Sequence, residues 1–75
     1  MITREQIARI EFEVDPDGIL RQEVRLGQVT RENVAEMARD TVDGLNAVWA
    51  DEGGCRATVA EIQEYYEYLL GEEGR

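Results

Sequence analysis

The segment from residue 30 to residue 52 is the longest stretch of unbroken helical periodicity in the chain, and it contains the only tryptophan. Its apolar residues recur at three- and four-residue steps, so on a helix with 3.6 residues per turn they form one broad stripe. The stripe, which also takes in one threonine, consists of Val34, Met37, Ala38, Thr41, Val42, Leu45, Val48 and Trp49. Such a helix has to bury this side against the rest of the chain. We therefore expect Trp49 to be buried in the core.

Residues 15–18 have the sequence Asp-Pro-Asp-Gly, which is the clearest turn signal in the chain. Proline presets the first turn position, and glycine takes the left-handed position that follows a type I turn in bulged hairpins. Residues 10–14 alternate strictly between apolar and acidic side chains, a pattern typical of a half-buried strand. The sequence therefore predicts a β-hairpin over residues 7–26, preceded by at most one turn of helix at residues 3–6.

A second helix is predicted over residues 59–70, because Thr58 and Glu61 have the spacing of a capping box. In this motif each side chain accepts a hydrogen bond from the other residue's backbone N–H group. The expected core stripe consists of Val59, Ile62, Tyr66, Leu69 and Leu70. Tyr65 and Tyr68 are expected to project away from this stripe, on a side of the helix rich in glutamate.

Together these elements predict a single small acidic α+β domain of ββαα order, with the hairpin packed on the long helix. The predicted ranges are about 7–26 for the hairpin, about 31–52 and 59–70 for the helices, and 71–75 for a frayed tail. A chain of 75 residues buries only about 60% of the surface that its unfolded form exposes, so it builds one modest core.

The charge balance is the strongest compositional feature of the chain. Seventeen acidic residues face eight basic residues, all of them arginine, and the formal charge is −9. This charge opposes direct binding to nucleic acid or to an anionic membrane and attracts basic protein surfaces. The competing interpretation is that the charge only keeps the domain soluble. No apolar run approaches the roughly 18 residues of a membrane span, so we expect a cytoplasmic protein without membrane contact.

Residues suited to catalysis or metal binding are scarce. The chain has no histidine, so a Cys–His pair and a histidine-containing zinc site are excluded. Cys55 is the only cysteine, so it has no partner for an internal disulfide. No glycine-rich phosphate loop precedes a helix. We expect no enzymatic activity, no catalytic residues, no cofactor and no metal.

The main functional hypothesis is a protein–protein interaction module that presents acidic groups to a basic groove. Such a module would act as an inhibitor or nucleic-acid mimic of a nucleic-acid-processing protein, as phage or mobile-element anti-CRISPR and anti-restriction proteins do. Glu36, Asp40 and Asp43 lie along the outer side of the long helix at four- and three-residue steps. The predicted partner-binding residues are Glu36, Asp40, Asp43, Asp51, Glu61, Glu64, Tyr65 and Tyr68.

Two other classes of function remain open at this point. The outer edges of a two-stranded hairpin are available for pairing with a second copy, which would make a homodimeric structural or assembly protein. Alternatively, a small regulator would bind nucleic acid directly through Arg4, Arg9, Arg21 and Arg25. The local charge of that region is still negative, which makes direct nucleic-acid binding the weakest of the three hypotheses.

Overall fold

The computed structural model describes residues 2–54 and 57–73, and every regular element in those two ranges is helical. The elements are α1 (Arg4–Glu13), α2 (Ile19–Arg25), α3 (Val34–Val48), the 3₁₀ turn η1 (Ala50–Glu52) and α4 (Val59–Glu73). The predicted α+β fold is therefore wrong. The region assigned to a hairpin forms α1 and α2, and the described ranges contain no strand through which two copies could pair edge to edge.

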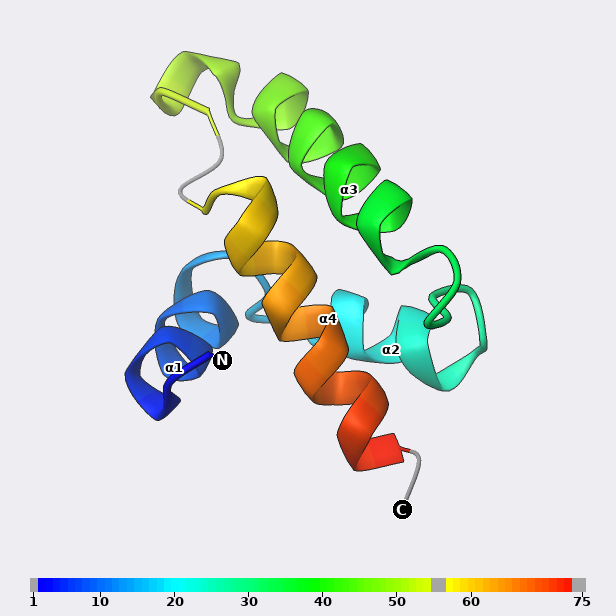
Figure 1. Ribbon diagram of the computed structural model, residues 1–75. Helices are drawn as coiled ribbons and strands as arrows, with labels where there is room; N and C mark the ends of the chain where they lie inside the picture. The colour runs from blue at the N-terminus through cyan, green and yellow to red at the C-terminus, as the bar shows by residue number, and fades with distance from the viewer. Residues whose placement is uncertain (1, 55–56, 74–75) are drawn as a thin grey trace.

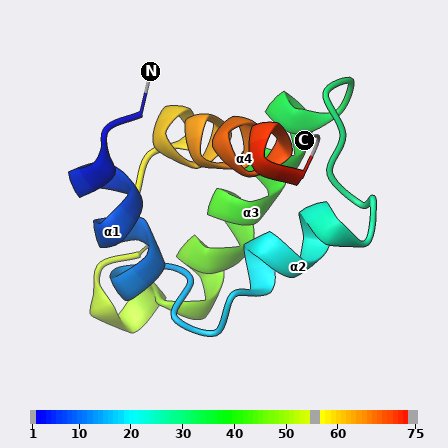
Figure 2. The ribbon, with the colours of Figure 1, turned by 90° about the horizontal axis from the view of Figure 1, so that it is seen from below.

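The central element is α4, which runs between α3 on one side and α1 on the other (Figure 1). It packs against α3, α2 and α1. The view from below shows α1 and α2 flanking α4 from different directions (Figure 2). The resulting bundle is elongated, with principal extents of 39 × 24 × 21 Å.

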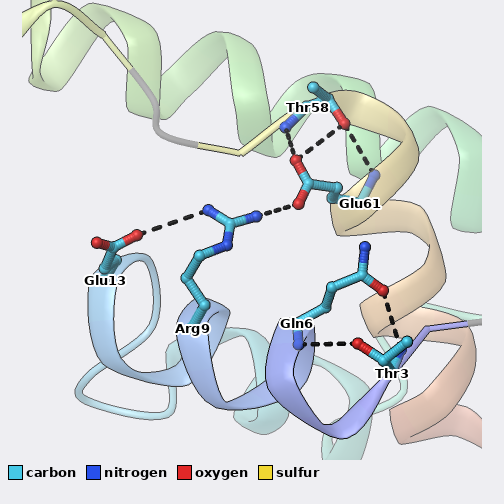
Figure 3. Close-up of polar contacts among 6 residues, drawn as sticks. All are labelled: Thr3, Gln6, Arg9, Glu13, Thr58 and Glu61. Atoms are coloured by element: carbon cyan, nitrogen blue, oxygen red, sulfur yellow. Dashed lines mark hydrogen bonds and ion pairs between the residues drawn. The ribbon is translucent and has the colours of Figure 1, made fainter.

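A capping box starts α1 (Figure 3). Thr3 Oγ1 accepts the N–H of Gln6 at 3.1 Å, and Gln6 Oε1 accepts the N–H of Thr3 at 2.9 Å. The helix then continues through the segment predicted to be a strand. Ile10 and Val14, four residues apart, are both buried, whereas Phe12 between them is 83% exposed. Ile10 and Val14 thus fit the four-residue spacing of one side of a helix, and Phe12 lies outside the core.

The turn predicted at residues 15–18 is present, but it joins two helices instead of two strands. Gly18 has a left-handed φ of 72°, and its N–H donates to the carbonyl oxygen of Asp15 at 3.2 Å. The buried Asp15 carboxylate accepts a hydrogen bond from the N–H of Leu20, whose nitrogen lies 3.2 Å from each carboxylate oxygen. The N–H groups in the first turn of a helix have no partner within the helix, and Asp15 supplies one for Leu20 in α2. Burial raises the pKa of Asp15, and this backbone hydrogen bond opposes the rise.

Charge pairing also favours helices over the predicted hairpin. A hairpin with its turn at residues 15–18 would place Glu11 opposite Glu23, and like charges at such positions are destabilising. In the helical structure Arg21 lies between two carboxylates, 3.2 Å from Glu11 on α1 and 3.0 Å from Glu72 on α4. One arginine of α2 therefore links three helices.

The long helix is shorter than predicted at both ends. Before it, Thr30 and Asn33 exchange hydrogen bonds between side chain and backbone at 2.7 and 3.3 Å, and α3 begins only after this turn. At its other end α3 stops at Val48, which is 74% exposed. Trp49 follows at the junction with η1 and is half-buried, so the expectation of a fully buried tryptophan was wrong.

The predicted second helix is confirmed as α4, including its capping box. Thr58 Oγ1 accepts the N–H of Glu61 at 3.1 Å, and Glu61 Oε1 accepts the N–H of Thr58 at 3.1 Å (Figure 3). The helix continues through Gly71 to Glu73, so the predicted tail begins too early.

The core forms where α4 meets the other helices. Four buried residues of α4 follow the i, i+3, i+4, i+7 spacing of an amphipathic helix. They are Ile62, Tyr65, Tyr66 and Leu69. The other buried apolar residues are Ile10, Val14, Leu20, Val24, Val29, Val34, Ala38, Val42 and Ala57. The stripe of α4 is rotated toward Tyr65 relative to the prediction, because α1 and α2 cover that side as well.

The difference between the helical bundle and a hairpin fold can be tested with two substitutions. Ile62→Ala removes a side chain with 0% exposure and should lower the free energy of unfolding by about 2–5 kcal/mol. Phe12→Ala removes an exposed ring and should change it by no more than about 0.5 kcal/mol. Urea denaturation of both variants gives the comparison. A large loss for Phe12→Ala would contradict the position of α1.

Gly44 offers a second test, because it lies inside α3 with no atom within 4 Å of the place where a Cβ would be added. Gly44→Ala should raise the free energy of unfolding by about 0.5–1 kcal/mol, since alanine loses less backbone entropy in a helix. Gly18→Ala is the matched control, because its surroundings are equally open but its φ is +72°. That change should destabilise the protein by about 1–2 kcal/mol. Equal effects at the two positions would contradict the assigned backbone.

Candidate functional site

Five carboxylates form what we call the acidic face, on the outer side of α3 and on η1. They belong to Glu36, Asp40, Asp43, Asp51 and Glu52. All five residues are exposed, and within residues 2–54 and 57–73 no hydrogen bond or ion pair is found for their side chains. Arg39 is the one basic residue exposed on the same stretch of helix. The structure thus groups four of the predicted partner-binding residues and adds Glu52 to them.

The orientation of this face follows from the packing of α3. Val34, Ala38 and Val42 are buried, and α4 is the helix against which α3 packs. At 100° per residue, Asp40 and Asp43 point to the side of α3 opposite this buried row. Glu36 to Asp43 spans seven residues, or about 10 Å along the axis. The α3 carboxylates of the acidic face are therefore turned away from the core.

Glu61 was also predicted to bind a partner, but the structure places it in internal contacts. It accepts the Thr58 N–H, and its second carboxylate oxygen pairs with Arg9 of α1 (Figure 3). Arg9 is also 3.5 Å from Glu13, one turn further along α1. The hydrogen bond from Thr58 and the Arg9 cation lower the pKa of Glu61. Glu61 thus caps α4 and connects it to α1.

The remaining predicted residues lie on α4, away from the acidic face. Tyr65 is 1% exposed, so its predicted place on the surface was wrong. Tyr68 is half-buried and donates its hydroxyl hydrogen to Glu72. Glu64 and Tyr68 line a groove of about 480 Å³ between α1 and α4. The other residues lining this groove are Ile2, Arg4, Ile7 and Glu67.

A second hollow, which we call the corner cleft, lies between the C-terminal end of α1 and the corner where α3 meets η1. It has a volume of about 310 Å³ and is lined by Phe12, Glu13, Trp49, Glu52 and Gly54. Sequence analysis missed it because Phe12 and Trp49 were both assigned to the core. The available signal was the position of Phe12, which falls outside the helical spacing of its apolar neighbours.

Comparisons with protein-family models, with curated proteins and with solved structures each gave no match. Across the part of the chain that the structure describes, no group of three or more acidic or cysteine side chains is arranged to hold a metal ion. None of the helices described is both long enough and apolar enough to cross a membrane. Cys55 lies outside the described residues.

The buried tyrosines predict a specific response to alkaline pH. Burial raises the pKa of Tyr65 to about 12, from about 10 in an unfolded chain. A group whose pKa is higher in the folded state than in the unfolded state contributes its full stabilisation at pH values below the unfolded-state pKa. This contribution is lost as the pH rises through the folded-state pKa. The free energy of unfolding should therefore fall between about pH 10 and 12.

Tyr65→Phe should make this alkaline loss of stability smaller, because phenylalanine has no proton to release. Urea denaturation at a series of pH values measures the effect, and tyrosinate absorbance follows ionisation in the folded protein. Ionisation of all three tyrosines at their ordinary pKa, with the fold intact, would contradict the burial of Tyr65.

Proposed function

We propose that this protein is a non-enzymatic binding module whose acidic face docks on a basic surface of another protein. The observation that carries the proposal is the separation of two kinds of carboxylate. Those of Glu11, Glu61 and Glu72 pair with arginines of α1 and α2 and so link neighbouring helices. Those of the acidic face point outward with no such pairing among the described residues. The acidic face thus gathers five carboxylates, unpaired within the described ranges, on consecutive elements, whereas Glu5, Asp17 and Glu67 are exposed singly elsewhere.

The spacing of these charges supports a binding role over solubility alone. Glu36 and Asp40 are four residues apart, and Asp40 and Asp43 are three apart, so each pair lies on the same side of α3. Like charges at these spacings destabilise a helix by a few tenths of a kcal/mol per pair, and Arg39, three residues after Glu36 and four before Asp43, offsets only part of this repulsion. Solubility requires charge but not its alignment in a row. A basic partner would turn this repulsion into attraction.

The most specific form of the proposal is mimicry of nucleic acid. Three of the five carboxylates, those of Glu36, Asp40 and Asp43, extend along about 10 Å of α3 at the helical rise of about 1.5 Å per residue. This gives roughly one charge per 5 Å, against one per 3.4 Å along a single DNA strand. A groove that binds nucleic acid is the kind of basic surface that accepts such a row. The protein would then act as an inhibitor of a nucleic-acid-processing protein, of the anti-CRISPR or anti-restriction type.

Direct binding to nucleic acid receives less support. Arg9 and Arg21 were two of the four arginines considered for contacts with phosphate. Both are engaged with carboxylates of the same chain. An arginine whose charge is already paired gains less from a phosphate, because the existing ion pair would have to break.

The proposal is tested by capturing partners from a nuclease-treated lysate of the source cells on the immobilised protein. We expect a protein with a basic surface to be retained at low salt and released at high salt, since exposed charges are screened. The variant Glu36→Gln/Asp40→Asn/Asp43→Asn should lose this protein. Mass spectrometry identifies it, and its competition with nucleic acid for the same groove tests mimicry.

A matched control separates the acidic face from net charge. The variant Glu5→Gln/Asp17→Asn/Glu67→Gln also removes three of the 17 acidic charges, from exposed positions outside the acidic face. It should retain the partner nearly as well as the unmodified chain does. Equal loss in both triple variants, or equal retention in both, would contradict a specific role for the acidic face.

A further inference from the structure

We propose that the corner cleft receives an arginine side chain of the bound protein. This inference rests on the proposed function in one respect, namely that the partner is a protein with a basic surface. It adds a defined anchor point to an otherwise extended electrostatic contact. Interfaces usually depend on a few such anchors, which fill pockets surrounded by weaker contacts.

The composition of the cleft fits a guanidinium group. Phe12 and Trp49 supply two aromatic rings, and Glu13 and Glu52 supply two carboxylates around the same hollow. The face of an aromatic ring attracts a cation, tryptophan most strongly. Arginine also stacks its planar group on aromatic rings while its N–H groups bond a carboxylate in a fork. Lysine has a compact, strongly hydrated charge and gains less from such a site.

Phe12 supplies exposed aromatic surface at the edge of the cleft. Its ring is 83% exposed, although it lies only two residues from the fully buried Ile10. Val48, on the same corner as Trp49, is 74% exposed. Aromatic residues are enriched at protein–protein interfaces, and their exposure here costs hydrophobic free energy that a partner would recover.

The cleft also adjoins the acidic face along the chain, because Glu52 lines the cleft and η1 follows directly after α3. A basic partner docked along α3 and η1 would therefore reach the cleft without a second binding site. Glu13 already pairs with Arg9 at 3.5 Å, so its charge is partly neutralised. Glu52 is the carboxylate that would carry most of the attraction. The volume of about 310 Å³ is at the lower end for small-ligand pockets, which suits one side chain.

The experiment is a titration of the isotope-labelled protein with the peptide acetyl-Gly-Arg-Gly-amide, followed by nuclear magnetic resonance. Trp49 is the only tryptophan, so its indole N–H signal reports on the cleft without ambiguity. We expect a saturable shift of this signal, with a dissociation constant on the order of millimolar for so small a ligand. The same peptide with citrulline, which has the shape of arginine without its charge, should bind at least about threefold more weakly.

Two pairs of matched variants locate the peptide. Phe12→Ala and Glu52→Gln should each weaken binding by about threefold or more. Leu26→Ala removes an exposed apolar side chain at the end of α2, and Glu32→Gln removes an exposed charge before the start of α3. Both control variants should leave the affinity unchanged. The inference is overturned if the Trp49 signal does not shift, or if all four variants behave alike. It is also overturned if citrulline or leucine peptides bind as tightly as the arginine peptide.

The triple variant Glu36→Gln/Asp40→Asn/Asp43→Asn separates this inference from the proposed function. Glu36, Asp40 and Asp43 lie on α3, before its junction with η1, and none of them lines the cleft. The variant should therefore bind the arginine peptide normally. If it does so and also still captures the partner, the acidic face is not the docking surface and the cleft remains a binding site. If it loses the peptide, arginine binds on the acidic face and the inference about the cleft is wrong.

Discussion

The structure depends on the burial of one side of α4, because each of the other three α-helices described packs against it. Ile62, Tyr65, Tyr66 and Leu69 form that side, and all are at most 1% exposed. Tyr66 brings a hydroxyl group into this apolar interior, where an unbonded polar group would be costly. Its oxygen lies 2.8 Å from Thr41 Oγ1 on α3, and it donates to Glu23 on α2 at 3.0 Å. One side chain thus joins three helices through packing and hydrogen bonding together.

The same packing decides which charges are neutralised inside the molecule. Because α1 and α2 lie against α4, Arg9 and Arg21 come within reach of carboxylates on neighbouring helices. None of the helices described covers the outer side of α3, so its carboxylates remain directed toward solvent. The corner cleft has a related origin, since the end of α3 extends beyond the contact with α4 and leaves Trp49 half-buried. Both parts of the proposed binding surface therefore follow from the position of α4.

Local signals in the sequence were accurate where they depended on neighbouring residues. The capping box of Thr58 and Glu61 starts α4 as predicted, and the turn at residues 15–18 is present. The error concerned the elements on either side of that turn. Five alternating residues fit a strand, but Ile10 and Val14 also fit one side of a helix, four residues apart. Phe12 differs between the two interpretations, because a strand would bury it and the helix exposes it.

The sequence by itself determined the two long helices, the capping box of α4, the acidic row on α3 and the absence of histidine chemistry. Each of these depends on composition or on residues within one or two turns of each other. Only the tertiary structure decided that residues 4–13 and 19–25 are helical, that Tyr65 is buried and that Phe12 and Trp49 border one cleft. These outcomes depend on contacts between residues that are distant in the chain. The physical reason is that α4, the last helix, supplies the surface against which the first two are buried.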